Sequence, residues 1–450
     1  PRVKMPELDP AYRVTTLHEE VNQGLSQEQA VLEATRCLDC PDPQCMTGCP
    51  VSINIPGFIK NIERGDFHQA ALVLKETSAL PAVCGRVCPQ EKQCESKCIY
   101  NKMKKPAVAI GYLERFAADY ERTSGQQAEP AKAASNGIKI AVVGSGPSGL
   151  SFAGDMAKRG FDVTVYEALH EIGGVLKYGI PEFRLPNAVV DVEIEGLRRL
   201  GVNFVKDCVV GKTLSYDDLH QMGFRGIFVG SGAGLPRFMG IPGENLNGVM
   251  SSNEYLTRIN LMHAGTPGCK NIAVIGGGNT AMDSVRTARR MGAERAMIVY
   301  RRSEAEMPAR VEEVKHAKEE GVEFLTLCNP VEYVGDEKGR VTTMKVQRMQ
   351  LGEPDASGRR SPVPVEGAID EIPVDVVIVS VGVSPNPLIP NSIDGLEITS
   401  RHTIVVNEDT LRSSLPDIYA GGDIVRGGAT VILAMGDGRK AAASMAGALL

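Results

Sequence analysis

Two glycine-rich turns, each between a short apolar run and a helical pattern, constrain the fold of this chain more than any other feature. The first follows the run IKIAVVG, which begins at Ile138, and the second lies in NIAVIGGGNTAMD, which begins at Asn271. Further apolar runs follow them, VTVYE at 163–167 and AMIVYRR at 296–302. A strand, a glycine turn, a helix and a second strand form a βαβ unit. We therefore expect an α/β protein with two Rossmann-like units.

The first turn reads Gly144-Ser145-Gly146-Pro147-Ser148-Gly149 and matches the G-x-G-x-x-G pattern of dinucleotide sites. Gly144 permits the tight turn, Gly146 lets a pyrophosphate approach the backbone, and Gly149 lets the helix pack on the strand. The helix N-terminus near Pro147 faces the negative charge. Glu167 follows Gly149 by 18 residues, where a carboxylate binds ribose hydroxyls. The sequence predicts a dinucleotide site here; a turn without a ligand is the alternative.

The second turn reads Gly276-Gly277-Gly278-Asn279-Thr280-Ala281, the variant with alanine in the third position. The next apolar run ends in Arg301 and Arg302 instead of an acid. A carboxylate would repel a ribose 2′-phosphate, whereas guanidinium groups can bind one through two hydrogen bonds each. This favours NADPH over NADH, unless both arginines only face solvent.

Composition and net charge limit the expected cellular location and binding partners of the chain. The net charge of −6 does not favour nucleic-acid binding, and no apolar run reaches the roughly 18 residues of a membrane span. We expect a cytoplasmic protein that binds neither nucleic acid nor membrane. Eleven cysteines in a reducing compartment are not expected to form disulfides. Cys208, Cys269 and Cys328 are scattered and predicted to be small buried side chains.

The other eight cysteines lie between Cys37 and Cys98 in two runs, spaced C-x2-C-x4-C-x3-C-P and C-x3-C-x5-C-x3-C. Zinc sites usually present two C-x2-C pairs separated by a longer loop, which neither run shows. The first run is close to the ferredoxin pattern, in which three cysteines hold one [4Fe–4S] cluster and the fourth holds another. We interpret the region as an iron–sulfur site, with zinc as the alternative.

The segment SLPDIYAGGD, which ends at Asp423, resembles the second flavin fingerprint of two-dinucleotide flavoproteins such as the glutathione reductase superfamily. Gly173-Gly174 also match that superfamily. The resemblance implies FAD in the first site, bound in part by Gly174, Gly422 and Asp423, and NADPH in the second. It also implies that the NADPH domain is inserted in the FAD domain. The redox-active disulfide of the disulfide reductases is missing, so electrons must leave through the cysteine-rich region.

Eight motifs in order resemble the small (beta) subunit of NADPH-dependent glutamate synthase and its relatives. The relatives include the N-terminal part of dihydropyrimidine dehydrogenase and the large subunit of NADH-dependent ferredoxin:NADP oxidoreductase. The motifs are RCLDCPDPQCMTGCPV, CGRVCPQEKQCESKC, AIGYLERF, GSGPSGL, YGIPEFRLP, GGGNTAMD, YRRSEAEMPA and AGGDIVRG.

This resemblance implies two interleaved [4Fe–4S] clusters. In the dehydrogenase a Gln completes the second cluster, and Glu114 stands at that position here; a solvated surface charge is the alternative for Glu114. Cys84 is left as a non-ligand. The implied ligands are Cys37, Cys40, Cys45 and Cys98 for one cluster, and Cys49, Cys88, Cys94 and Glu114 for the other.

Five segments are expected. They are a helical domain with two clusters at 1–125, a linker at 126–137, the first part of the FAD domain at 138–265, the NADPH domain at 266–384 and the second part of the FAD domain at 385–450.

The expected activity is an NADPH-dependent flavin and iron–sulfur oxidoreductase that passes electrons to a partner subunit. The cofactors carry the chemistry, so no catalytic side chain is expected. In one interpretation a glutamate synthase large subunit receives the electrons and makes glutamate from glutamine and 2-oxoglutarate. In the other the chain is the large subunit of a flavin-bifurcating transhydrogenase, with ferredoxin and an NAD-reducing small subunit as partners. A non-catalytic zinc-stabilised binding module is the remote alternative.

Overall fold

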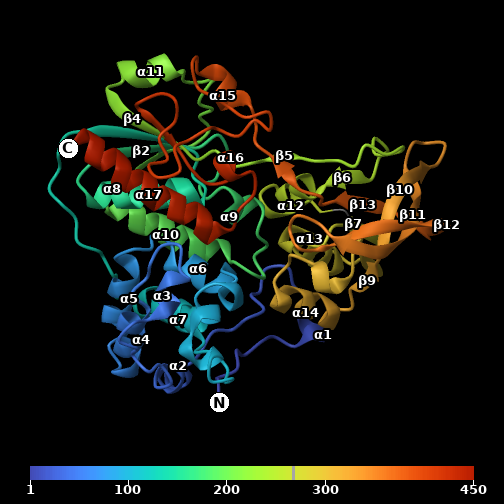
Figure 1. Ribbon diagram of the computed structural model, residues 1–450, viewed down its shortest axis with the longest axis horizontal. Coiled ribbons are helices and arrows are strands. Elements are labelled where there is room, and N and C mark those ends of the chain that lie inside the picture. Colours follow the sequence, from blue (N-terminus) through green and yellow to red (C-terminus); the bar gives the residue numbers. More distant parts are fainter. Residues whose placement is uncertain (266–268) are drawn as a thin grey trace.

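The computed structural model describes residues 1–265 and 269–450. Along the chain come a helical unit, a first α/β unit and a second α/β unit, and the second α/β unit is inserted in the first (Figure 1). No helix among the described residues has the length and apolar character needed to cross a bilayer.

In the helical unit, capping residues begin the helices and a Gly-Asp pair separates two of them. Ser26 and Gln29 form a capping box, with reciprocal hydrogen bonds of 3.1 and 2.9 Å. Gly65 adopts a φ of +80° and Asp66 caps the next helix, so this Gly-Asp pair separates two helices. The helices are α1 (Pro10–Arg13), α2 (Gln27–Ala34), α3 (Gln44–Thr47), α4 (Ile55–Glu63), α5 (Phe67–Lys75), α6 (Pro81–Val87) and α7 (Ile110–Ser124), with 3-10 turns at Gln90–Lys92, Glu95–Lys97 and Ile99–Asn101.

The first α/β unit is built on a parallel five-stranded sheet in the order β15-β4-β1-β2-β3. Its central strand carries the run Ile140 to Val142, which is fully buried because helices cover both faces. The strands are β1 (Lys139–Val143), β2 (Asp162–Tyr166), β3 (Asn203–Val205), β4 (Phe224–Val229) and β15 (Ile418–Ala420). The helices are α8 (Pro147–Lys158), α9 (Val175–Tyr178), α10 (Asn187–Arg199), α11 (Tyr216–Gln221), α15 (Leu388–Ser392), α16 (Asp423–Arg426) and α17 (Val431–Leu449).

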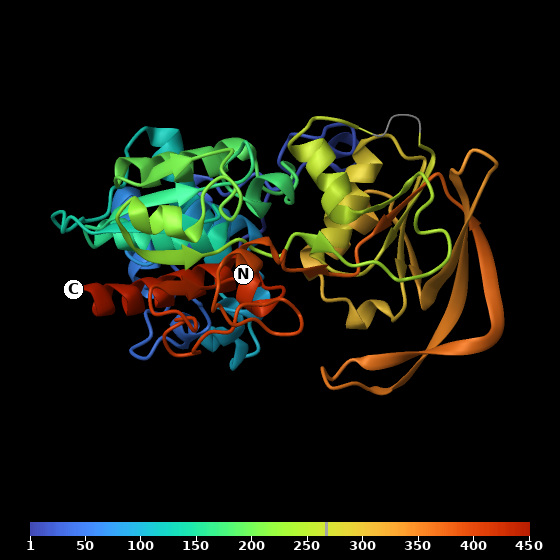
Figure 2. The ribbon, with the colours of Figure 1, turned by 90° about the horizontal axis from the view of Figure 1, so that it is seen from above.

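The second α/β unit repeats this plan with the parallel order β6-β13-β7-β8-β9. An antiparallel sheet of three strands is inserted between β9 and β13 and projects from the body of the molecule (Figures 1 and 2). The elements are β6 (Val249–Ser251), α12 (Ser252–Asn260), β7 (Asn271–Ile275), α13 (Asn279–Arg290), β8 (Arg295–Tyr300), a 3-10 turn at Glu304–Glu306, α14 (Val311–Glu319), β9 (Glu323–Thr326), β10 (Cys328–Gly335), β11 (Val341–Pro354), β12 (Arg360–Pro373) and β13 (Val376–Val379).

Two connecting strands join the α/β units. β5 (Leu235–Pro236) leaves the first unit and pairs antiparallel with β14 (Val383–Ser384), which returns to it. Downstream, β15 pairs with β4 of the first sheet. The predicted return of the chain to the first α/β unit is therefore confirmed. β6 precedes residue 266 but pairs with β13, so we propose that the second unit begins nearer to Val249 than to 266.

The helical unit shares a hydrophobic core with the first α/β unit, to which side chains of α6, α8, α10 and α17 contribute. The segment 126–137, which forms neither helix nor strand, connects them; its residue Ala128 is buried, and Lys75 donates to the Ala128 carbonyl at 3.0 Å. The cysteine-rich region is thus fixed against the flavoprotein-like unit. Of the three scattered cysteines, Cys208 is buried as expected, whereas Cys269 and Cys328 are half-buried.

Candidate functional site

Four cysteines of the helical unit line one cavity of about 90 Å³. Burial raises the pKa of the Cys45 thiol to about 12, and the other three thiols add to this shift because they lie close to it. Apolar side chains such as Ile59 and Ile110 line the rest of the cavity. The fold therefore brings three thiols of the first run to the last thiol of the second. We call these residues the first cysteine group: Cys37, Cys40, Cys45 and Cys98.

A second set of side chains meets closer to the first α/β unit. Burial raises the pKa of the Cys49 thiol to about 11 and also raises the pKa of the Cys94 thiol. The neighbouring Cys88 and Glu114 contribute to both shifts. Cys88 and Cys94 are buried, whereas every member of the first cysteine group is partly exposed. Cys49 therefore crosses from its own run to this second site. We call these residues the second cysteine group: Cys49, Cys88, Cys94 and Glu114.

Glu114 points from α7 into this second site, and no described residue supplies a compensating positive charge that lowers its pKa. Burial raises its pKa to about 8, and the buried carboxyl of Glu193 adds to the shift. Its Oε1 atom has no hydrogen-bond partner within the part of the chain that the structure describes. A buried carboxylate without a partner is costly, whereas a metal cation would satisfy it. Three thiols and this carboxylate fit a [4Fe–4S] cluster with one non-cysteine ligand.

Cys84 lies between the second cysteine group and the first α/β unit. It is fully buried on α6, one turn before Cys88, and its thiol donates to Met435 Sδ of α17 at 3.4 Å. Cys88 and Glu114 are also neighbours that raise its pKa. That Cys84 is not a ligand stays a prediction.

The first glycine turn has the geometry that a bound pyrophosphate requires. A Cβ at Gly144 would lie 2.4 Å from the carbonyl oxygen of Gly230, and one at Gly149 would lie 2.1 Å from that of Gly144. A Cβ at Gly146 would meet nothing within 4 Å, so this position faces open space at the start of α8, where Pro147 is the first residue. The turn thus combines tight packing on one side with an open helix N-terminus on the other.

The acids predicted to bind the flavin nucleotide lie around this turn. Glu167 directly follows β2, and its carboxylate accepts hydrogen bonds from the backbone and hydroxyl of Ser145 at 3.2 and 2.5 Å. Asp423 begins α16 and accepts from the backbone N–H of Ala429 at 2.8 Å; burial raises its pKa. Tyr178, which begins the motif YGIPEFRLP but was given no role there, is half-buried near both acids; desolvation, with Asp423 and Glu167, raises its pKa to about 12.

Two further glycines close the same site. Gly174 adopts a φ of +57°, and a Cβ there would lie 2.9 Å from the Cα of Gly146. Gly422 adopts a φ of +77°, and a Cβ there would lie 2.9 Å from the hydroxyl of Ser148. Both glycines therefore allow their loops to approach the first turn closely, which fits a cofactor held between them.

The second glycine turn opens into a cavity of about 570 Å³, within the size range of small-molecule sites. Gly276 adopts a φ of +141°, and a Cβ there would lie 2.2 Å from the carbonyl oxygen of Ser380. Gly278, Asn279 and Thr280 line the cavity at the start of α13. Ala281 is fully buried in the core beneath it. The turn thus has the same plan as the first.

Arg301 and Arg302 follow β8 and line this cavity. Arg301 is exposed, whereas Arg302 is 5% exposed and donates from Nη2 to Asp355 at 2.8 Å. The buried Nε and Nη1 atoms of Arg302 have no partner among the described residues. These free donors fit a phosphate group. Asn329 and Arg359 also line the cavity, and no sequence motif indicated either of them.

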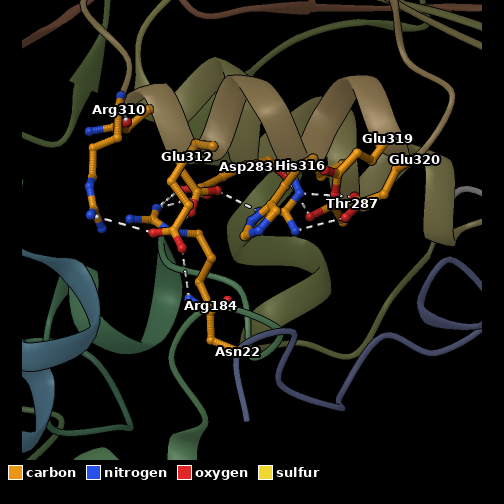
Figure 3. Close-up of polar contacts among 12 residues, drawn as sticks. Asn22, Arg184, Asp283, Thr287, Arg310, Glu312, His316, Glu319 and Glu320 are labelled. Carbon is orange, nitrogen blue, oxygen red and sulfur yellow. Dashed lines mark hydrogen bonds and ion pairs between the residues drawn. The ribbon is translucent and has the colours of Figure 1, made fainter. Parts of the chain in front are cut away.

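A network of buried ion pairs connects the N-terminal segment to the second α/β unit (Figure 3). Glu320 accepts from Arg13 at 2.7 Å, from Arg286 at 2.9 Å and from Arg290 at 2.6 Å. Arg184 of the first α/β unit pairs with Asp283 at 2.8 Å. These contacts fix the second α/β unit against the rest of the molecule. Sequence patterns did not reveal them, because the partners are far apart along the chain.

Comparisons with known protein families agree with this arrangement. Residues 13–126 match the family described as dihydropyrimidine dehydrogenase domain II, 4Fe-4S cluster. Residues 138–438 match the pyridine nucleotide-disulphide oxidoreductase family. The first match favours iron–sulfur over the zinc alternative.

Curated relatives align along most of the chain. The glutamate synthase [NADPH] small chain of Azospirillum brasilense is 35% identical over 98% of this chain and 93% of its own length. The small chain of Escherichia coli is 36% identical over 94% of this chain and 92% of its own length. The NADP(+)-dependent formate dehydrogenase subunit beta of Moorella thermoacetica is 39% identical over 89% of this chain, which spans 59% of that subunit.

Solved structures share the fold of the two α/β units. FprA from Mycobacterium tuberculosis in complex with NADPH has a TM-score of 0.60 and 21% identity, and the match covers 70% of this chain and 85% of FprA. The thioredoxin reductase of T. acidophilum has a TM-score of 0.53 and 20% identity, over 69% of this chain and 97% of that one. The two family matches give the order of an iron–sulfur unit followed by pyridine nucleotide oxidoreductase units, which is the order expected from the motifs.

Proposed function

Because the chain belongs to the glutamate synthase small-chain family, we propose that it supplies electrons from NADPH to a large subunit that makes glutamate from glutamine and 2-oxoglutarate. The chain is an NADPH-dependent oxidoreductase with FAD and [4Fe–4S] clusters. When bound, FAD exchanges hydride with NADPH, and the clusters transfer single electrons. The partner and the residue assignments below are the proposed part.

The second glycine turn and its two arginines bind NADPH in this proposal. The backbone at Gly276 and Gly278 receives the pyrophosphate at the N-terminus of α13. Arg301 and Arg302 bind the 2′-phosphate, which supplies the unpaired Nε and Nη1 donors of Arg302 with acceptors.

The first turn and the segment after β15 bind FAD. The backbone at Gly144, Gly146 and Gly149 receives its pyrophosphate, with Pro147 beginning the helix behind it. Glu167 orients the ribose, and Asp423 orients the chain that leads to the flavin ring. Gly174 and Gly422 let their loops approach the first turn closely, and half-buried Tyr178 lies near the two acids.

The observation that carries the proposal is the spatial order of the sites. The second cysteine group lies next to α17 of the first α/β unit, where Cys84 contacts Met435, and the first cysteine group lies beyond it with all thiols partly exposed. We assign one cluster to each group. Glu114 serves as the fourth ligand of the inner cluster, and the partner docks nearer to the outer one.

Reconstitution tests this proposal. The purified chain is combined with a glutamate synthase large subunit, and glutamate formation from glutamine and 2-oxoglutarate is measured with NADPH and with NADH. We expect NADPH-dependent glutamate. A variant with both Arg301→Ala and Arg302→Ala should retain FAD and iron but lose the preference for NADPH, and an unchanged preference would overturn the assignment of these arginines.

The alternative partner is an outcome of the same experiment. If no glutamate forms, but the chain reduces ferredoxin and NAD together with an NAD-reducing small subunit, then it belongs to a bifurcating transhydrogenase instead. The relative named for formate dehydrogenase makes this control necessary, because chains similar to this one work with different partners.

A further inference from the structure

The hairpin formed by β11 and β12 is longer than the antiparallel sheet needs. β10 pairs with β11 only as far as Arg348, while β11 and β12 continue to pair as far as Pro354 and Arg360. The outer half of the hairpin is therefore a two-stranded arm. Figure 2 shows this orange arm curving back toward the body of the second α/β unit.

The tip of the arm is a tightly bonded turn at residues 355–359. The backbone N–H of Asp355 donates to the carbonyl of Arg359 at 2.7 Å, and that of Gly358 donates to the carbonyl of Asp355 at 2.9 Å. Gly358 adopts a φ of +81°. The Oδ1 atom of Asp355 accepts from the backbone of Ser357 at 2.8 Å and from that of Arg359 at 3.3 Å. The turn therefore presents Arg359 in a fixed place.

This turn contacts the cavity of the second glycine turn. The Oδ2 atom of Asp355 accepts from Arg302 at 2.8 Å, so one carboxylate contacts both the arm and the buried arginine. Arg359 lines the cavity together with Arg301 and Arg302. Its Nε donates to the hydroxyl of Ser357 at 3.1 Å, which leaves the terminal nitrogens of the guanidinium for another acceptor.

The three arginines carry more positive charge than the nearby acid neutralises. Asp355 contacts one nitrogen of Arg302, whose Nε and Nη1 atoms have no partner within 1–265 and 269–450. A phosphate monoester carries up to about two negative charges and three acceptor oxygens, and arginines bind it through paired hydrogen bonds. The surplus of donors therefore matches a phosphate better than a neutral hydroxyl pair.

We propose that Arg359, placed by the turn of the β11–β12 hairpin, is a third guanidinium of the subsite for the ribose 2′-phosphate, and that Asp355 is a positioning residue for Arg302 and Arg359. This inference rests on the proposed NADPH site. It assigns to the hairpin arm a role in selecting the phosphorylated nucleotide, which the two arginines after β8 do not fulfil alone.

Binding of two small probes to the intact holoenzyme tests the inference without an activity assay. The probes are adenosine 2′,5′-bisphosphate and adenosine 5′-monophosphate, measured by calorimetry. Arg359→Ala should weaken binding of the bisphosphate about tenfold, the effect of one charge-assisted contact, and leave the monophosphate unchanged. Asp355→Ala should weaken the bisphosphate selectively by a smaller factor.

Arg360→Ala is the matched control on the same arm. Arg360 is exposed and donates to the carbonyls of Gly352 and Leu351 in its own hairpin at 3.2 and 3.0 Å. It should leave the affinity for both probes unchanged.

The outcomes distinguish a failure of the proposed NADPH site from a failure of the proposed role of Arg359. If the unmodified protein does not prefer the bisphosphate, the proposed NADPH site falls and this inference falls with it. If it prefers the bisphosphate and Arg301→Ala removes the preference while Arg359→Ala retains it, only the inference is overturned. Equal weakening of both probes by Asp355→Ala would overturn its positioning role.

Discussion

Glu114 and Glu320 are buried glutamates in two regions of the molecule with opposite surroundings. Burial alone would raise the pKa of Glu320, but its arginine partners lower it well below the usual value. Glu114 has no such arginine partner among the residues that the structure describes, and burial raises its pKa to about 8. Glu320, a buried acid paired with arginines, holds the N-terminal segment against the second α/β unit. A buried acid with an unpartnered oxygen, next to three thiols, instead supports our proposal that this side chain binds a metal.

Glu114→Ala should have the largest effect, because it removes the carboxylate that we propose as a cluster ligand. We expect the iron content of the purified protein to fall from about eight to about four atoms per chain. One of the two cluster signals in the EPR spectrum should disappear. Unchanged iron and spectra would contradict the assignment of Glu114.

Two matched variants sharpen this test. Glu193 is also fully buried, with its pKa raised to about 7, but it accepts a hydrogen bond from the backbone of Ala82 at 3.1 Å. Glu193→Ala creates a similar cavity and should retain the iron. Glu114→Gln should retain both clusters and raise the potential of one, since a neutral ligand replaces a negative one.

Glu320→Ala should have the next largest effect. It leaves three buried arginines without their shared acid, and removal of one partner from a buried pair costs about 3–5 kcal/mol. Urea denaturation at neutral pH measures this loss. Glu319→Ala is the control, because Glu319 is 31% exposed and should cost less than about 1 kcal/mol. Equal losses would show that burial of the pair is unimportant.

Acidification should weaken the same junction by a smaller amount. Burial opposes ionisation of Glu313, but Arg184 and Arg286 lower its pKa from 4.5 to about 2. The unfolded chain therefore binds the proton first, and the stabilisation present above pH 4.5 is lost as the pH falls toward 2. We expect a loss of about 1–3 kcal/mol from this group. Glu313→Gln should flatten the pH dependence of the free energy of unfolding; an equally steep curve would contradict this.

The smallest effect is expected at an exposed pair. Lys318 and Glu304 are in contact at 2.6 Å, but both side chains are 47% exposed. Glu304→Ala should change the free energy of unfolding by less than about 1 kcal/mol, because water and salt screen the pair. If Glu304→Ala lowered the free energy of unfolding as much as Glu320→Ala does, the expected difference between buried and exposed acids would be wrong.

Local patterns predicted a large part of the fold. The strand before Gly144 and the positions of Glu167 and Arg302 at strand ends depend on residues close in sequence, so a local pattern was enough to predict them. The grouping of Cys98 with the first cysteine run required the family resemblance, because spacing alone does not choose between partners.

The sequence alone did not predict the contacts between segments that are far apart along the chain. The turn that places Arg359 at the cavity has ordinary turn residues, and only the curvature of the arm brings it to Arg302. Arg13 and Glu320 are separated by most of the chain. β6 has only three residues and pairs with β13, which no local periodicity reveals.

The insertion of the second α/β unit has a consequence for biosynthesis. A ribosome makes the entire second α/β unit before it makes β15 and α17. Until β15 is made, β4 is therefore an unpaired edge strand of the first sheet. α17 also supplies Met435, which contacts Cys84 beside the second cysteine group. The proposed inner cluster site is therefore completed only by a helix that is made late, and we expect this cluster to be inserted after translation has passed the second α/β unit.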